Sequence, residues 1–156
     1  MYKIRNITER DAAVLRFLAQ NCPPLGVHTH YTYWVVAKYY SEGGYILEND
    51  GNPVGYIMTV DAPSAIFIWQ IGILSEHRRK GLSQMLIEAV VRYANKVSKN
   101  LEVTIAADNV SSYCAFHCFC LKNKITFEKI DNVNIRDLYD TVFKESEIQF
   151  RMIISN

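Results

Sequence analysis

The chain has 156 residues, the length of one ordinary domain, which is long enough to bury a full hydrophobic core. Hydrophobic residues make up 49% of it and charged residues 21%, a composition typical of globular rather than disordered chains. The formal net charge of +1 provides no broad field for nucleic acid or an anionic membrane, and no apolar run approaches the ~20 residues that span a bilayer. We therefore expect one domain over residues 1–156. The charged first residues lack the apolar core of a signal peptide and favour the cytoplasm.

Hydrophobic periodicity and turn residues predict the elements in chain order. They are a strand at 2–7, a helix at 8–21 with Thr8 as its N-cap, a loop at 22–30, a helix at 31–43, strands at 44–50 and 53–62 around a turn at 49–52, a strand at 65–74, a helix at 81–97, a strand at 101–108, a helix at 109–124, and strands at 125–130 and 147–154. An early antiparallel meander followed by strand–helix–strand units predicts an α/β sandwich.

Clustered cysteines and histidines raise the question of a metal site. They are Cys22, Cys114, Cys118 and Cys120, with His117 among the last three, and His28 with His30 in the first loop. Cys114 and Cys118 share a helix face whereas Cys120 points elsewhere, and neither group is completed by further ligands at zinc-like spacing. We predict reduced, buried thiols and no metal.

The stretch "EHRRKG" lies between a predicted buried strand and a predicted helix. The first turn of a helix presents unpaired N–H groups and the positive end of the helix dipole, and both favour anions. Gly81 would let a phosphate approach the backbone, and Arg78, Arg79 and Lys80 add positive charge. The turn suits a pyrophosphate, although it is neither a P-loop nor Gly-x-Gly-x-x-Gly, and the alternative is a solvated basic turn.

With these residues the chain resembles the GNAT superfamily of N-acetyltransferases, whose signature after the fourth strand is Gln/Arg-x-x-Gly-x-Gly/Ala. The segment "RRKGLS" fits it, with a small Ser in the last position. The resemblance implies a three-layer sandwich, in which helices flank a mixed, mostly antiparallel twisted sheet, and it implies acetyl-CoA as the co-substrate. The implied cofactor-binding residues are Arg78, Arg79, Lys80, Gly81, Leu82, Ser83 and Gln84 at the pyrophosphate, Asn109 and Phe116 along the pantetheine arm, and Ile71, Gly72 and Ile73 at the thioester.

Four longer segments resemble the diaminobutyrate acetyltransferases of ectoine biosynthesis, a subfamily of the same superfamily. They are "CPPLGVHTHYTYW", "FIWQIGILSEHRRKGL", "LEVTIAADNVSSYCAF" and "ESEIQFRMI". The resemblance implies transfer of acetyl from acetyl-CoA to one amine of 2,4-diaminobutyrate. Three positions depart from the subfamily pattern, since Gly26 replaces an Asp, Lys144 a His and Val103 a Thr. Loss of the Asp removes a charge-assisted hydrogen bond to a substrate ammonium, worth about 1.5–3 kcal/mol.

Acetylation of an amine requires removal of a proton from an ammonium group whose pKa is about 10. The candidate carboxylates are Glu102, Glu145 and Glu147. Glu102 can equally be an ion-paired strand residue, and Glu147 a solvated acid on an edge strand. A backbone N–H of a bulged strand near residues 71–73 would stabilise charge on the thioester oxygen. Phe116 stands where many superfamily members have a Tyr that protonates the leaving thiolate, so water or Tyr113 is left for that role.

Aromatic side chains that can hold a cation, together with late acids, are candidates for the acceptor pocket. The substrate-binding candidates are Tyr31, Tyr33, Trp69, Glu145 and Glu147. Core packing is the alternative for Trp69 and for Tyr33. The leading function is N-acetylation of a small amino acid or diamine by a homodimer, which the resemblance implies. The alternatives are another acceptor, such as a polyamine or a protein amine, and an acyl-CoA-binding module without catalysis.

Overall fold

The computed structural model describes residues 1–133 and 147–154. Its elements are β1 (Tyr2–Asn6), α1 (Ala12–Gln20), α2 (His30–Tyr39), β2 (Tyr45–Asn49), β3 (Asn52–Asp61), β4 (Ala65–Ile73), the 3₁₀ turn η1 (Ser75–His77), α3 (Leu82–Lys96), β5 (Asn100–Ala106), α4 (Val110–Asn123), β6 (Thr126–Asn132) and β7 (Glu147–Ile153). Each predicted helix and strand is present within a few residues of its predicted bounds. In this described part of the chain, no helix is long and apolar enough to cross a membrane.

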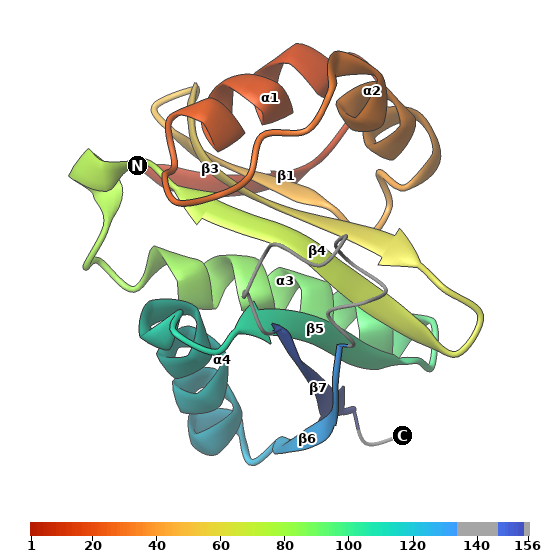
Figure 1. Cartoon of the computed structure of the whole chain (residues 1–156). Coiled ribbons are helices and arrows are strands. Elements are labelled where there is room, and N and C mark those ends of the chain that lie inside the picture. The colour runs from red at the N-terminus through yellow and green to blue at the C-terminus, as the bar shows by residue number, and fades with distance from the viewer. Residues whose placement is uncertain (134–146, 155–156) are drawn as a thin grey trace, which may run out of the picture.

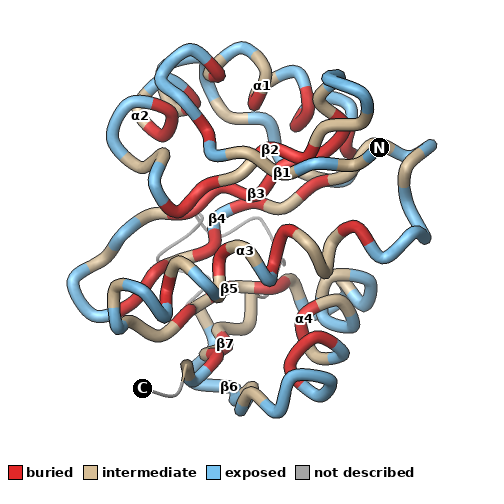
Figure 2. Tube along the Cα trace, turned by 180° about the vertical axis from the view of Figure 1, so that it is seen from behind, coloured by how far each residue is buried: buried red, intermediate tan, exposed pale blue. Residues whose placement is uncertain are grey.

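The sheet is the middle of three layers, with α1 and α2 on one face and α3 and α4 on the other (Figure 1). Each face has its own hydrophobic core. Ile66, Leu86 and Phe116 belong to the core on the α3/α4 face, and Leu15 and Tyr33 to the core on the α1/α2 face. Buried residues follow the central strands and the helix sides that face them (Figure 2). The predicted three-layer sandwich is confirmed.

The described strands form a sheet in the order β1-β2-β3-β4-β5-β7-β6. Neighbouring strands in it are antiparallel except β4 and β5, which run parallel. The β4–β5 pairing joins residues 65–68 to residues 100–103 and then stops. Because β4 continues to Ile73 and β5 to Ala106, the two strands part in the middle of the sheet.

A β-bulge in β4 changes which layer its side chains meet. Met58 of β3 pairs with Gln70 and Thr59 pairs with Ile68, so Trp69 is the extra residue. Before the bulge the even-numbered residues of β4 face the α3/α4 core, and after it they face α1 and α2. The bulge predicted near residues 71–73 therefore lies at Trp69, because the long-range register between β3 and β4 determines its position.

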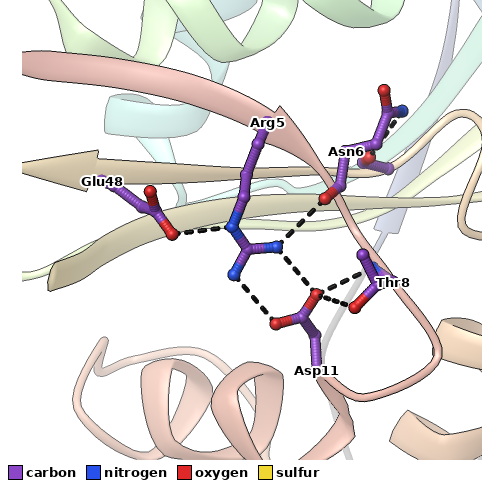
Figure 3. A network of polar contacts seen from close by, with 6 residues as sticks. Arg5, Asn6, Thr8, Asp11 and Glu48 are labelled. Carbon is purple, nitrogen blue, oxygen red and sulfur yellow. Dashed lines mark hydrogen bonds and ion pairs between the residues drawn. The ribbon is translucent and has the colours of Figure 1, made fainter. Parts of the chain in front are cut away.

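An ion-paired network ties the first strand to the first helix (Figure 3). The Arg5 guanidinium donates to the two carboxylate oxygens of Asp11, at 2.8 and 2.9 Å, and to Glu48 Oε1 on β2 at 2.7 Å. Thr8 donates to Asp11 Oδ2 from its backbone N–H at 2.7 Å and from its hydroxyl at 2.8 Å. Burial raises the pKa of the Asp11 carboxyl, but the hydrogen bonds from Arg5 and Thr8 outweigh it and hold the pKa below its usual value.

The prediction of Thr8 as the helix N-cap is wrong. Helix α1 begins at Ala12, and Asp11 occupies the N-cap position without a capping hydrogen bond from its side chain. The Thr8 hydroxyl donates to Asp11, so the residue serves the ion-paired network instead of accepting a helix N–H. The pairing of Asp11 with Arg5 on β1, which a local motif does not reveal, decides where the helix starts.

Replacing Asp11 with Asn should lower the free energy of unfolding near pH 7 by about 1–3 kcal/mol, because a charge-assisted hydrogen-bond network is broken. The folded-state pKa is lowered, so this contribution is complete above roughly pH 4, the pKa of an unfolded Asp, and is lost as the pH falls through the folded-state pKa. Urea titrations across this range should show the two proteins converging in acid. Glu9→Gln, which breaks the exposed pair with Lys38, is the control and should leave stability unchanged. Equal losses in both variants would contradict the role given to Asp11.

Candidate active site

The parting of β4 and β5 leaves one edge of β4 without a strand partner beyond Ile68 among residues 1–133 and 147–154. On its other edge, residues 70–73 remain paired with β3. A free strand edge offers a row of backbone N–H and C=O groups to an extended ligand. The predicted thioester residues Ile71, Gly72 and Ile73 all lie on this edge.

Gly72 lets the loop between α1 and α2 pack directly on β4. A Cβ at this position would lie 2.8 Å from Leu25 Cδ1 and 3.2 Å from Cys22 Cβ. Contacts this short are too close for packed carbon atoms, so the loop can occupy its place only because residue 72 lacks a side chain. As a result, loop residues 26–28 lie beside the bulge at Trp69.

The side-chain amide of Gln70, buried on β4, anchors this loop. Its Oε1 accepts from the hydroxyls of Tyr56 at 2.8 Å and Tyr33 at 3.2 Å, and its Nε2 donates to the backbone oxygen of Gly26 at 2.6 Å. The Tyr33 hydroxyl also accepts from the backbone N–H of His28 at 3.3 Å. Burial raises the pKa of both tyrosines, so they remain protonated donors near neutral pH. The network fixes the backbone of residues 26 and 28 against the strand.

Trp69 and His28 form the accessible end of this cluster. Their ring centroids are 5.0 Å apart, and Trp69 is 37% exposed. Burial lowers the pKa of His28, so its imidazole is neutral near pH 7. Tyr33 lies behind this pair and is fully buried. Tyr31, predicted to share the pocket, is 71% exposed and stacks on Trp34 with centroids 5.7 Å apart, so the structure does not bring it to Trp69.

The turn before α3 has the geometry of an anion site. Arg79 and Gly81 both adopt left-handed backbone, with φ of 61° and 72°. The positive φ at residue 81 favours glycine. A Cβ at Gly81 would meet nothing within 4 Å, so the space over the turn is open. Helix α3 begins at Leu82, whose side chain is in the core, and Ser83 follows in its first turn. The orphan N–H groups of that turn are available to a ligand.

Two of the three basic side chains of the turn hold neighbouring segments. Arg78 donates from Nε to the backbone oxygen of Ile73 at 2.8 Å and from Nη2 to that of Pro23 at 3.3 Å. Lys80 Nζ donates to the Tyr2 hydroxyl at 3.2 Å and lies 5.8 Å from the centre of that ring. Anion affinity therefore rests mainly on backbone N–H groups, with the charges of Arg78 and Lys80 nearby.

The predicted cofactor residues of α3 and α4 hold these two helices together or cap them. Gln84 Nε2 donates to the backbone oxygen of Ala115 at 3.0 Å. Asn109 is the N-cap of α4, and its Oδ1 accepts from the Ser112 N–H at 3.1 Å. Phe116 is buried in the α3/α4 core. The contact of Asn109 with a pantetheine arm stays a prediction.

Tyr113 lies on the side of α4 that faces β6 and β7. Its ring centroid is 5.9 Å from that of Phe127 on β6 and 5.6 Å from that of Phe150 on β7. With Asn109 it lines a cavity of about 120 Å³ between α4, β5 and β7. The cavity includes Ala106 at the end of β5, and the role of Tyr113 toward a leaving thiolate stays a prediction.

Glu102 was predicted to be either a catalytic base or an ion-paired strand residue, and the structure shows the ion pair. Its Oε1 accepts from Arg151 Nε at 3.1 Å and Nη2 at 2.9 Å, and its Oε2 accepts from Gln149 Nε2 at 3.1 Å. Both partners lie on the neighbouring strand β7, where Arg151 stands directly opposite. Both carboxylate oxygens are engaged across the sheet, so the role of Glu102 as a catalytic base is less favoured and stays a prediction.

Glu147 is a described acid at the open end of β5. It begins β7 and pairs with Ala106, the last residue of β5. This end of β5 lies beyond Val103, where the pairing with β4 has stopped. The role of Glu147 at the acceptor stays a prediction. Glu145, with the neighbouring Lys144, lies outside the described residues.

The four thiols are free, but only two of them are buried. Cys22 and Cys120 pack inside, whereas Cys114 and Cys118 are exposed. The prediction of buried thiols is therefore wrong for two positions, because their shared face of α4 points to solvent. Within residues 1–133 and 147–154, no three His, Cys, Asp or Glu side chains are grouped as a metal site.

Three residues of the cluster at the bulge were not predicted to act there: Tyr56, Gln70 and His28. A sequence signal existed for Gln70, which is the one polar side chain in the apolar run "AIFIWQIGIL". A polar group in the middle of a central strand has to be hydrogen-bonded, so it marks a network. His28 carried no such signal, because its place depends on how the loop packs on Gly72.

The chain belongs to the acetyltransferase (GNAT) family, whose sequence profile matches residues 12–117. It is similar to the L-2,4-diaminobutyric acid acetyltransferase of Halomonas elongata, with 30% identity over 118 residues that make up 72% of this chain and 62% of the relative. The enzyme of the same name from Marinococcus halophilus is 26% identical over 151 residues, or 93% of this chain and 86% of the relative. The chain thus spans about 62% of the length of the Halomonas protein.

The fold is shared with a solved diaminobutyrate acetyltransferase from Paenibacillus lautus, in complex with L-2,4-diaminobutyric acid and coenzyme A. The TM-score is 0.88 at 22% identity, and the match covers 99% of this chain and 95% of that one. The ribosomal-protein-S18-alanine N-acetyltransferase of Escherichia coli has the same fold, with a TM-score of 0.78 at 15% identity over 100% of this chain and 96% of that one.

Replacing Gln70 with Leu should lower the free energy of unfolding by about 2–4 kcal/mol, because each of two tyrosine hydroxyls left buried without an acceptor costs about 1–3 kcal/mol. The double variant Gln70→Leu/Tyr33→Phe should lose less than the sum of the two single variants, since one orphaned hydroxyl disappears. Chemical denaturation of the three proteins measures both effects. Strictly additive losses would show that the Tyr33 hydroxyl does not depend on Gln70.

Proposed function

We propose that the chain is an acetyl-CoA-dependent N-acetyltransferase that acetylates one amine of a small diamino acid, 2,4-diaminobutyrate or a close analogue. The proposal rests on the opening between β4 and β5. The turn before α3 belongs to the α3/α4 layer, and the paired rings of Trp69 and His28 lie beside the α1–α2 loop, so a donor and an acceptor can meet across the gap. The relatives named as diaminobutyrate acetyltransferases support this choice of acceptor.

The donor side uses mainly the backbone of the chain. Bound acetyl-CoA supplies an activated acyl thioester. Residues 78–84 are expected to hold its pyrophosphate through backbone N–H groups, with Arg78 and Lys80 contributing charge. The free edge of residues 69–73 is expected to pair with the pantetheine arm, and a backbone N–H at the bulge to stabilise charge on the carbonyl oxygen. The side chains of Ile71 and Ile73 pack against the α3/α4 core, which keeps this edge in register.

The acceptor side combines an aromatic face with an unpaired guanidinium. The Trp69 ring can hold an ammonium, and Glu147 is a carboxylate near the mouth of the gap. The Nε–H of Arg16 on α1 is buried and has no hydrogen-bond partner among the described residues. Burial raises the pKa of Tyr33, and the charge of Arg16 acts against that rise. A buried Nε–H of a guanidinium without a partner suits the carboxylate of an amino acid, which a polyamine lacks.

The remaining parts of the proposal concern assembly and compartment. The chain is proposed to act as a single domain, as a homodimer and in the cytoplasm. The exposed thiols Cys114 and Cys118 suit a reducing compartment, and the homodimer follows the resemblance to the superfamily. Light scattering coupled to size-exclusion chromatography tests the dimer directly.

Purified protein with acetyl-CoA should release CoA when given 2,4-diaminobutyrate, and far less with 1,3-diaminopropane, which has the same two amines and no carboxylate. Arg16→Gln should raise KM for 2,4-diaminobutyrate roughly 10- to 100-fold, the loss expected for one charge-assisted hydrogen bond, and leave KM for 1,3-diaminopropane unchanged. Arg92→Gln, which removes an exposed arginine paired with Glu88, is the control.

Each contrary result identifies a different alternative. Binding of acetyl-CoA without turnover of any amine would leave the acyl-CoA-binding module. Turnover of polyamines or peptide amines with 2,4-diaminobutyrate inert would leave an acetyltransferase for another acceptor. An equal rise in KM for both diamines would remove the carboxylate role of Arg16.

Gly81→Trp should weaken CoA binding roughly 10- to 100-fold, because the indole would occupy the open space over the turn and displace at least one phosphate hydrogen bond. Gly51→Trp is the matched control, since Gly51 also has positive φ and open space around its Cβ direction but lies in the β2–β3 turn. Both variants should lose about 1–2 kcal/mol of stability through backbone strain. Isothermal titration with CoA separates them, and normal affinity in the Gly81 variant would show that the phosphate binds elsewhere.

A further inference from the structure

His28 is the titratable side chain that the structure places against the bulge residue. Its ring lies 5.0 Å from that of Trp69 and 6.0 Å from that of Tyr33. Its backbone N–H is tied to the Tyr33 hydroxyl, and Gly26 in the same loop is tied to Gln70. The imidazole is thus held on a fixed backbone at the point where β4 leaves β5.

The groups around His28 leave it uncharged. Tyr33 from α2 has its pKa raised by burial, as has Tyr56 from β3, so both face this region as neutral hydroxyls. Arg16 from α1 carries a positive charge that lowers the pKa of Tyr33 and so acts against the effect of burial. Burial is the cause of the lowered pKa of His28, and no carboxylate among the described residues counteracts it. The imidazole therefore has a free lone pair near pH 7.

The other described candidates for proton transfer are engaged or lie elsewhere. Glu102 is paired with Arg151, and Tyr113 faces β6 and β7. Glu147 stands at the start of β7, separated from β4 by the width of β5. His28 is the described residue that combines a free lone pair with a position beside the opening.

We propose that His28 accepts the proton that the acceptor nitrogen loses as it attacks the thioester carbonyl, an inference that rests on the proposed function. The neutral amine forms by loss of one proton from the ammonium to water. As the N–C bond forms and the C–S bond breaks, the second proton passes from nitrogen to the imidazole, and the imidazolium returns it to the departing thiolate. The balance is one amine and one thioester giving one amide and one thiol.

An imidazole suits this second proton better than the first. A free alkylammonium has a pKa of about 10, far above that of a histidine, so His28 would strip it inefficiently. A nitrogen that is bonding to a carbonyl carbon is much more acidic, and proton transfer is efficient when donor and acceptor pKa values lie close together. Neutral His28 also avoids repulsion of the cationic substrate, which an imidazolium would cause.

The test compares pH profiles of kcat and KM for the wild type, His28→Asn and the control His30→Asn. His30 lies two residues along, at the exposed start of α2. His28→Asn should lower kcat by about 100-fold, leave KM for acetyl-CoA unchanged, and lose the acid limb that the wild type shows as His28 protonates below the ordinary histidine pKa. Added imidazole should restore part of the rate in His28→Gly. His30→Asn should match the wild type.

The outcomes separate the two levels of the proposal. A wild type that acetylates no amine overturns the proposed function and this inference with it. An active wild type whose His28→Asn variant keeps its kcat and its acid limb, or shows only a raised KM for the amine, overturns the inference alone. Thermal melting and CoA titration establish that the variants are folded. If His28→Asn does not fold, His28→Gln takes its place with the same expected results.

Discussion

The parting of a parallel strand pair in mid-sheet is the constraint on which the site depends. Beyond Ile68 and Val103 the two central strands stop bonding to each other, although both continue. Backbone groups in the interior of a protein need partners, so a sheet can open there only if something else satisfies that edge. In the proposed function, the extended, amide-containing arm of a bound thioester supplies such a partner. The opening and the ligand therefore explain each other.

The bulge at Trp69 makes this opening two-sided. In a strand that alternated regularly through Trp69, Gln70 and Gly72 would face the same core as Ile66, and the α1–α2 loop would lack both the Gln70 hydrogen bond and the space over Gly72. With the bulge, the same strand supports a cofactor face and an acceptor face in successive residues. In the proposed function the reaction takes place where the two faces meet, so the bulge at Trp69 would determine which groups reach the reacting carbonyl.

Features encoded by neighbouring residues were predictable from the sequence, and features made by distant pairs were not. The helices, strands and glycine turn before α3 follow from local periodicity and backbone preference, and they agree with the structure. The bulge position and the engagement of Glu102 by Arg151 each depend on a residue of another strand. The role of Thr8 depends on Asp11 being held by Arg5 of β1, an ion pair that a capping motif does not reveal. The cluster at the bulge draws on α2, β3, β4 and a loop, and for that reason His28 and Tyr56 gave no advance signal.

The hydrogen bond from Gln70 to the loop affects which loop side chains can change between related proteins. Its side-chain amide donates a hydrogen bond to the backbone oxygen of Gly26, a group that every amino acid possesses. A Cβ at that position would meet nothing within 4 Å, and its backbone is not left-handed. Residue 26 can therefore exchange its side chain without disturbing the scaffold, so charge at the acceptor can be added or deleted by a single substitution. Substrate selectivity can therefore change through residue 26 while the fold and the loop position stay the same.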